Sequence, residues 1–369
     1  MRQLKIEPVI YEYDGCRDFF KVFRIGKDDL IISNQKLYDE YLKYHIKESA
    51  VILIDNYGKG YPTDNIVESI YESVKKITYE RVIAIGGNSI LEIGKIFSLK
   101  NISPVNKLFN HKLDIVKEKE LVLVQTTCGT GSEITNICTL KFQNEKRKKE
   151  LNADELYADS AVLIPELLKS LPLNIFLENS INAFINAVDS YISPKATEYT
   201  QLFSERAIKI FLNGYKKIIL DEEDCINLLS RDFLFASNYA GISLGNTGHG
   251  IIHSFGKNLS LNEELTIKES NYIIFTTVLR RYAKKLANTE KLNRILSTLL
   301  NCNENKIYDE LDNILNKIFY RKRLSEFGIE RNQLNDIIRN MIELQNKDKC
   351  LKDFLLSEGE IYDLYESVY

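Results

Sequence analysis

Two histidines and a lysine follow one another at four-residue intervals in the second half of the chain: His249, His253 and Lys257. On a helix, residues with this spacing share one face. An imidazole exchanges protons near neutral pH, and a lysine in a closed site stabilises an oxyanion or captures a carboxylate. The alternative for Lys257 is a side chain that reaches solvent from a helix end. The spacing therefore predicts a proton-transfer site beside a positive charge.

Two glycine-containing signatures follow apolar runs in the first half: GGNSILEIGK at 86–95 and TTCGTGSE at 126–133. After a strand, adjacent glycines let the backbone approach a ligand, and the helix that follows presents free N–H groups to a phosphate. Threonine hydroxyls at a strand's end add donors at the edge where α/β sheets bind ligands. Tight turns also need glycine for steric reasons, but the presence of both signatures favours a nucleotide cofactor.

Short β-branched runs alternate with amphipathic stretches from about 29 to 164, a pattern typical of parallel strands joined by helices. The runs expected to form the central strands lie at 30–33, 51–54, 82–85 and 121–124. After Pro165, helical periodicity dominates. We therefore predict an α/β plus all-α protein: a doubly wound, dinucleotide-binding domain over 1–164 and an all-helical domain over 165–369.

The composition excludes several kinds of partner. The 369 residues carry a formal net charge of -3, with 44% hydrophobic and 27% charged residues. That is globular composition without the basic excess that nucleic acid or an anionic membrane would require. No apolar stretch is long enough for a membrane span, and the six cysteines lack CxxC or zinc spacing. We therefore expect a soluble, cytoplasmic protein with free thiols.

These motifs together resemble the iron-containing alcohol dehydrogenases, over nearly the whole chain. The family's phosphate loop, GGGSxxDxAK, matches 86–95 with Asn88 and Glu92 among the departures, and its TTxGTGSE motif is matched at every specified position over 126–133. Its HGxxHxxG stretch stands at 249–256 as HGIIHSFG. The resemblance implies a dehydroquinate synthase-like fold, in which a parallel-sheet domain precedes a helical one.

The resemblance also implies a nicotinamide cofactor lying between the two domains. The residues that it assigns to cofactor binding are Asn34, Gly86, Gly87, Asn88, Ser89, Thr126, Thr127, Thr130 and Leu171. Asn34 follows the first expected strand, where the family often has an acidic residue at the adenosine ribose. An asparagine neither repels nor pairs with a 2′-phosphate, so NAD and NADP both remain open.

The metal site of the family is largely missing. There, an Asp and a His four residues apart on one helix face join two later histidines to hold a divalent ion. Here Asn182 and Asn186 stand at the first two positions, His249 at the third, and the fourth falls near Glu263. Neutral amides are poor ligands for Fe²⁺ or Zn²⁺, so no metal is expected. Asp189 would replace a ligand only through a register shift.

We therefore expect a metal-independent NAD(P)-dependent oxidoreductase that interconverts a secondary alcohol and a carbonyl on a small acidic substrate bearing a carboxylate. His253 aligns with the family histidine close to the nicotinamide and is the expected acid/base. Lys257, Asn182 and Asn186 are expected to hold the substrate oxygen, with His249 beside them.

Two alternatives remain open. One is an oxidative decarboxylase or dehydrogenase acting on a β-hydroxy acid or a peptide C-terminus. The other is a nucleotide-binding pseudoenzyme or scaffold subunit. The family resemblance is compatible with a homodimer.

Overall fold

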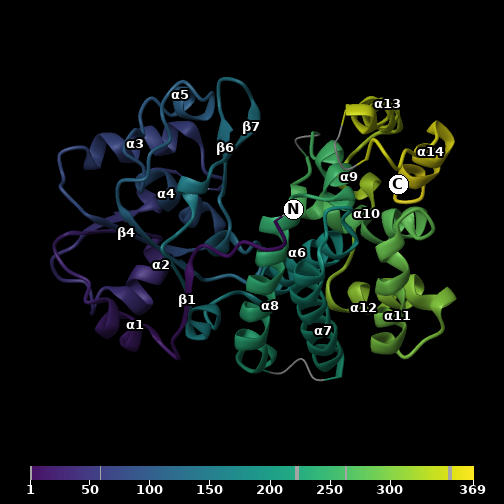
Figure 1. The fold of residues 1–369 in the computed structure, drawn as a ribbon, viewed down its shortest axis with the longest axis horizontal. Coiled ribbons are helices and arrows are strands. Elements are labelled where there is room, and N and C mark those ends of the chain that lie inside the picture. The colour runs from purple at the N-terminus through teal and green to yellow at the C-terminus, as the bar shows by residue number, and fades with distance from the viewer. Residues whose placement is uncertain (1, 59, 221–223, 262–263, 348–350) are drawn as a thin grey trace. The chain divides into compact units, whose positions relative to one another are not determined.

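The computed structural model describes residues 2–58, 60–220, 224–261, 264–347 and 351–369. The chain forms two compact units, which are described separately. The first comprises Ile6–Leu171 and contains the large sheet (Figure 1). The second comprises Pro172–Tyr369 together with the first residues up to Lys5.

The first unit is built on a six-stranded, fully parallel sheet with the strand order β1-β8-β5-β4-β2-β3. Its strands are β1 (Val9–Glu12), β2 (Asp29–Ser33), β3 (Ala50–Leu53), β4 (Arg81–Gly86), β5 (Glu120–Gln125) and β8 (Ser160–Leu163). The four strands expected from the sequence all form, and the apolar runs of β2, β4 and β5 are buried inside the sheet. The expectation that 51–54 is a central strand is wrong, since β3 lies at the edge of the sheet and is only partly buried. The doubly wound fold class is thus confirmed.

Helices cover both faces of this sheet (Figure 1). Alternate residues of a strand point to opposite faces, so Val82 packs in one core and Ile83 in the other. The elements on the Val82 side are α3 (Asp64–Val74), α4 (Asn88–Phe97), α5 (Val105–Phe109) and the antiparallel hairpin of β6 (Ile137–Phe142) and β7 (Arg147–Asn152). On the Ile83 side lie α1 (Cys16–Phe23) and α2 (Gln35–Leu37), which continues into a π-helical turn (Tyr38–Leu42).

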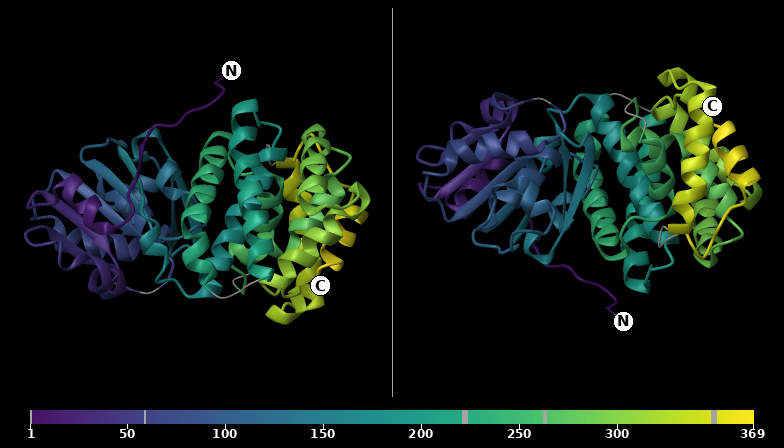
Figure 2. Two further views of the ribbon diagram at one scale, coloured as in Figure 1. Left: turned by 90° about the horizontal axis from the view of Figure 1, so that it is seen from below. Right: turned by 90° about the horizontal axis from the view of Figure 1, so that it is seen from above.

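The second unit is entirely helical in its described part, as the sequence predicts. Three long helices lie side by side in Figures 1 and 2: α6 (Leu173–Ile192), α7 (Glu198–Leu220) and α8 (Cys225–Thr247). The remaining helices are α9 (Ile251–Leu259), α10 (Ile267–Tyr282), α11 (Ala287–Leu300), α12 (Ile307–Ile318), α13 (Arg331–Lys347) and α14 (Glu358–Glu366). Buried aromatic rings join the long helices; those of Phe211 and Phe233 lie 5.0 Å apart. Within the described ranges, none of the helices combines the length and apolar character needed to cross a bilayer.

The segment after the last strand belongs to the sheet unit. Pro165–Leu168 forms a 3₁₀ turn, and Leu167 packs in the same core as Ile164. Near the N-terminus, the backbone of Lys5 is bonded to the side chain of Asn246 on α8. Lys5 N–H donates to Asn246 Oδ1 at 2.6 Å, and Asn246 Nδ2 donates to Lys5 O at 2.9 Å. The chain therefore passes between the units twice, once after Lys5 and once after Leu171.

Candidate functional site

The phosphate loop connects β4 directly to α4. Gly87 is the N-cap of α4 and no side chain caps the helix, which leaves the amides of Asn88 and Ser89 open to an anion, while Ile90 N–H donates to Gly87 O at 2.9 Å. A Cβ on Gly86 would lie 2.3 Å from Ile90 Cδ1, which makes glycine a steric requirement of the turn. A Cβ on Gly87 would lie 3.4 Å from Thr127 Cγ2, so this glycine faces the second signature. The open helix start and the close backbone fit a pyrophosphate.

Two of the residues that depart from the family's loop, Asn88 and Glu92, contact each other. Asn88 Nδ2 donates a 2.7 Å hydrogen bond to Glu92 Oε1, one turn further along α4. Glu92 is buried, and burial raises the pKa of its carboxyl above the usual range. Ser89, the other expected phosphate contact, lies in the first turn of α4. Asn88 therefore has a structural partner in this chain besides its expected role at the cofactor.

The second signature is held against the first by backbone and side-chain contacts. Thr126 N–H donates to Gly86 O at 3.1 Å, and Gln125 Nε2 donates to Thr127 Oγ1 at 3.1 Å. The hydroxyl oxygen of Thr130 is buried without a hydrogen-bond partner in the described part of the chain. A buried hydroxyl in this state suits contact with a ligand. The two loops thus offer the groups that a dinucleotide requires.

Lys95 links the helix of the first signature to the loop of the second. Its Nζ donates to Ile137 O at 2.8 Å and to Ser132 Oγ at 3.2 Å, and the side chain is fully buried. Burial lowers the pKa of the Lys95 ammonium below its usual range, and the neighbouring Glu92 opposes that shift. The same Nζ also donates to the hydroxyl of Thr135, just after the second signature, at 3.4 Å. Lys95 therefore positions the second loop relative to α4.

The remaining expected cofactor residues lie elsewhere in the sheet unit. Asn34 follows β2 and caps α2, because its Oδ1 accepts a 2.8 Å hydrogen bond from Leu37 N–H. Leu171 is the final residue of the unit, and its N–H donates to Leu168 O. The carboxyl ends of β2 and β4 share one edge of the parallel sheet, so Asn34 and the phosphate loop lie at the same edge.

In the helical unit, the two histidines stack on each other. The ring centroids of His249 and His253 are 3.6 Å apart, with an interplanar angle of 10°. His249 precedes α9, whose N-cap is Gly250, so only His253 and Lys257 share the helix. A turn at Gly248, with φ of 70°, brings the ring of His249 over that of His253. The structure thus pairs the histidines by a loop and a helix rather than by one helical face.

Asp189 of α6 organises the start of α9. Its carboxylate accepts hydrogen bonds from the backbone N–H groups of Gly250, Ile252 and His253 at 3.0, 2.9 and 3.2 Å. A Cβ on Gly250 would lie 2.5 Å from Asp189 Oδ1, so glycine is needed for this approach. Gly256 has a similar role, since a Cβ there would lie 1.9 Å from Asn271 Oδ1. The glycines of HGxxHxxG therefore allow close packing.

His253 is held in the neutral state. Burial, followed by electrostatic repulsion from His249 and Lys257, lowers the pKa of His253 well below its ordinary value of 6.5. A neutral imidazole accepts a proton, which is the function required when an alcohol is oxidised. Lys257 lies one turn further along α9 with an exposed side chain. Its position is compatible with both alternatives stated for it above.

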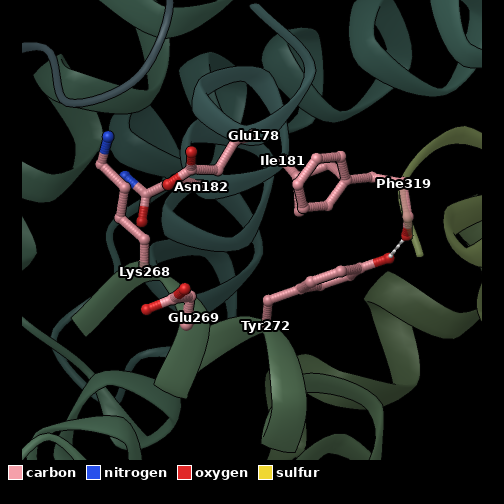
Figure 3. Close-up of a pocket in the computed structure, with 7 residues that line it drawn as sticks. All are labelled: Glu178, Ile181, Asn182, Lys268, Glu269, Tyr272 and Phe319. Carbon is pink, nitrogen blue, oxygen red and sulfur yellow. Dashed lines mark hydrogen bonds between the residues drawn. The ribbon is translucent and has the colours of Figure 1, made fainter. Parts of the chain in front are cut away.

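Asn182 and Asn186 both lie on α6, and Asn182 lines a small pocket (Figure 3). The residues around this pocket, which has a cavity volume of about 20 Å³, are Glu178, Ile181, Asn182, Lys268, Glu269, Tyr272 and Phe319. In Figure 3, Lys268 extends past the amide of Asn182, while the rings of Tyr272 and Phe319 lie on the other side. Lys268 Nζ also donates a 2.8 Å hydrogen bond to Asn179 Oδ1.

The described residues do not fit a family-type metal ion. The amides of Asn182 and Asn186 stand on α6 at the positions that the resemblance assigns to the first two ligands, and the carboxylate of Asp189 is engaged by three backbone amides. Apart from the residues left undescribed, no group of three or more His, Cys, Asp or Glu is placed to hold a metal. Glu263, expected near the fourth position, lies outside the described residues.

A parallel-sheet unit carrying two nucleotide-type loops and a helical unit carrying the HGxxHxxG helix define an alcohol dehydrogenase-like oxidoreductase. The iron-containing alcohol dehydrogenase model matches residues 14–165, and the C-terminal model of the Fe-containing alcohol dehydrogenase family matches 176–369. The chain therefore belongs to the iron-containing alcohol dehydrogenase family. Membership favours an enzyme over the scaffold alternative.

Individual members of the family with known names resemble this chain to different degrees. The chain is 36% identical over 371 residues to 4-hydroxybutyrate dehydrogenase of Clostridium kluyveri, with 100% of both chains covered. It is 28% identical to sulfoacetaldehyde reductase of Bilophila wadsworthia, covering 74% of this chain and 73% of that one. The fold matches a sulfoacetaldehyde reductase from Bifidobacterium kashiwanohense, solved in complex with NAD⁺, with a TM-score of 0.85 at 16% identity, covering 100% and 98%.

Sequence reasoning missed two contributions to the site. Lys268 carries no motif, and its contact with Asn179 spans 89 positions, so only the fold reveals it. Asp189 was considered as a substitute metal ligand, whereas the structure uses its carboxylate to cap α9. An aspartate on the buried face of an amphipathic helix was the available signal, since a buried carboxylate needs hydrogen-bond donors.

Proposed function

We propose that this protein is a metal-independent, NAD-dependent oxidoreductase that interconverts an alcohol and a carbonyl on a small carboxylate-bearing substrate. Two relatives support an anionic substrate by their names, since 4-hydroxybutyrate carries a carboxylate and sulfoacetaldehyde a sulfonate. The NAD⁺ complex of a structural relative supports the cofactor. The open start of α4 supports dinucleotide binding in this chain itself.

The observation that carries the proposal is the position of Lys268 beside Asn182. Lys268 brings a positive charge to the pocket, and the amide of Asn182 adds a hydrogen-bond donor. Of the two acidic residues there, Glu269 is engaged in the capping box of α10, where its carboxylate accepts from Thr266 N–H at 2.8 Å. Lys268 and Asn182 are therefore the residues proposed to recognise a carboxylate, and Glu178 is the acidic side chain of the pocket with which that carboxylate would compete for Lys268.

Proton transfer is assigned to His253. Bound nicotinamide supplies the hydride acceptor or donor at its C4. Because the pKa of His253 is lowered, its imidazole is neutral and has a lone pair that can accept the hydroxyl proton during oxidation, as a weaker base than an ordinary histidine. Asn186, and Lys257 if its ammonium turns inward, are the residues proposed to hold the substrate oxygen. No step requires a metal ion.

The substrate test uses 4-hydroxybutyrate and NAD⁺, with 1-butanol as a neutral comparison. Lys268→Met is expected to raise KM for 4-hydroxybutyrate by about tenfold or more, the loss of roughly 1.4 kcal/mol of charge pairing, and to leave 1-butanol unaffected. The matched control is Lys284→Met, which removes an exposed lysine beyond α10. Equal effects of Lys268→Met on both alcohols would contradict carboxylate recognition by Lys268.

Whether the enzyme prefers a primary or a secondary alcohol is tested by comparing two substrates. The hydroxyl of 4-hydroxybutyrate is primary, whereas the sequence led us to expect a secondary alcohol, so 3-hydroxybutyrate is tested alongside. Release of CO₂ from 3-hydroxybutyrate, detected by mass spectrometry, would support the decarboxylating alternative. Metal independence is tested by chelation: loss of activity with EDTA and its recovery with Zn²⁺ or Fe²⁺ would overturn it.

A further inference from the structure

Three adjacent parallel strands bring distant residues together at the adenosine end of the expected dinucleotide site. The order β4-β2-β3 places the end of β2 between those of β4 and β3. Gly86 ends β4, Asn34 follows β2, and Asp55 lies in the 3₁₀ turn after β3. A dinucleotide with its pyrophosphate at β4 extends its adenosine toward β2, so a 2′-phosphate would point toward β3.

The backbone amides at the start of α2 are already occupied by this chain's own side chains. Asp55 Oδ2 accepts a 2.6 Å hydrogen bond from Gln35 N–H, and Asn34 Oδ1 accepts from Leu37 N–H. A 2′-phosphate would require such donors, and here it would have to displace a carboxylate to reach the first of them. The start of α2 is therefore unsuited to a second phosphate.

The charges around this point are also unfavourable to NADP. A second carboxylate, Asp39, accepts a 2.8 Å hydrogen bond from Gln35 Nε2. Of the neighbouring lysines, Lys36 Nζ donates to Ser170 O at 2.7 Å, and Lys43 Nζ lies 3.9 Å from Asp39 Oδ1. A 2′-phosphate carries negative charge and would meet the carboxylate of Asp55, and these two lysines already have other partners within the described part of the chain.

We propose that Asp55, on the strand next to β2, selects NAD over NADP in this protein. The position after β2 holds the neutral Asn34, so the repulsion comes instead from the neighbouring strand. Asp55 is 20 positions from its partner Gln35 in the sequence. NAD has neutral ribose hydroxyls in place of the 2′-phosphate. It can therefore bind while Asp55 keeps its hydrogen bond to Gln35 N–H, and no charge repulsion arises. The inference rests on the proposed dinucleotide binding.

The test measures dissociation constants of NADH and NADPH by nicotinamide fluorescence, without turnover. The wild-type protein is expected to bind NADH at least about tenfold more tightly than NADPH. Asp55→Asn and Asp55→Ser should reduce that ratio about tenfold, mainly by tightening NADPH binding, because repulsion of the phosphate is removed. Glu40→Gln, which removes an exposed carboxylate from the same segment, should leave the ratio unchanged.

The outcomes separate this inference from the proposed function. If the wild-type protein binds both dinucleotides equally, or if both Asp55 variants keep the wild-type ratio, the role of Asp55 is wrong while dinucleotide binding stands. If the folded wild-type protein binds neither NADH nor NADPH, the proposed function itself is overturned and the selectivity with it. A thermal melt of each variant confirms that the folded state is being compared.

Discussion

Asp189 and His253 are joined by a hydrogen bond of 3.2 Å, from the backbone N–H of the histidine to the carboxylate of the aspartate. The same carboxylate holds the N–H groups of Gly250 and Ile252. Because these donors lie at the start of α9, the position of the His253 ring depends on a side chain of α6. Asp189 is thus a positioning residue for the proposed acid/base.

Asp189→Asn should reduce both stability and turnover. The amide keeps the volume but turns an N–H₂ group toward backbone donors, so we expect a loss of about 1–3 kcal/mol in the free energy of unfolding. Urea denaturation measures it. Ser190→Ala is the matched control, because the neighbouring hydroxyl is buried without a partner among the described residues and its removal should cost little. A fully stable Asp189→Asn variant would contradict the capping role.

The pH dependence of stability should also report on Asp189. Burial raises the pKa of its carboxyl from 3.8 to about 6, although backbone hydrogen bonds oppose the shift. Between these values, the folded protein holds a proton that the unfolded chain has released, so rising pH lowers the free energy of unfolding. The difference in the free energy of unfolding between wild type and Asp189→Asn should therefore shrink from about pH 4 to about pH 7 and stay constant above. If the stability difference grew over this pH range, the pKa of Asp189 would be lowered in the folded protein rather than raised.

Replacing His253 should impair catalysis without affecting the cofactor. For His253→Gln we expect a fall in kcat for alcohol oxidation of about 10²–10⁴-fold, the usual contribution of a positioned base. The dissociation constant of NADH should change far less than kcat, because the phosphate loop that is expected to bind the pyrophosphate belongs to the other unit. Steady-state kinetics and a fluorescence titration measure the two quantities. Unchanged turnover would remove His253 from the mechanism.

Lys95→Met should weaken cofactor binding. The methionine fills a similar volume but loses the hydrogen bonds to Ile137 O and Ser132 Oγ that hold the second loop. We expect NADH to bind about tenfold more weakly, equivalent to one hydrogen bond to a charged group. Lys100→Met, at an exposed position beyond α4, is the control. Equal NADH affinity in wild type and Lys95→Met would show that the link is dispensable.

The metal site should be recoverable by two substitutions. Asn182→Asp with Asn186→His recreates an acidic ligand and an imidazole on one face of α6, with His249 as a further candidate ligand. The double variant is expected to retain Zn²⁺ after dialysis, whereas wild type and the Asn182→Asp single variant lose it. Metal analysis of the purified proteins decides the matter. A double variant with no more zinc than wild type would show that the surrounding cavity has also changed.

The sequence predicted the parts of the fold that depend on continuous patterns. β2, β4 and β5 were recognisable because their residues are apolar along most of their length, whereas β1 is exposed at all four of its positions and was missed. β7 was missed for a related reason, since its lysine-rich sequence resembles a solvated surface. The inner strand β8 was also missed, although all four of its residues are buried. The cofactor loops were identified as motifs, but their contact through Lys95 requires the folded arrangement of α4 and the second loop.

The parts of the site that could not be predicted are contacts between distant segments. The glycines at 250 and 256 were visible as a motif, yet the reasons for them, Asp189 and Asn271, lie on other helices. Lys268 likewise reaches the pocket only because α10 packs on α6. Such contacts depend on tertiary packing, which local periodicity does not encode.

The pair of asparagines on α6 has a consequence at the level of the gene. In the genetic code, each Asn codon becomes an Asp codon or a His codon when only its first base is changed. Asn182 and Asn186 therefore stand a single point mutation each from the acid and the imidazole of metal-dependent relatives. A lineage with this chain can gain or lose those two ligands in small mutational steps, while the helix that carries them stays the same.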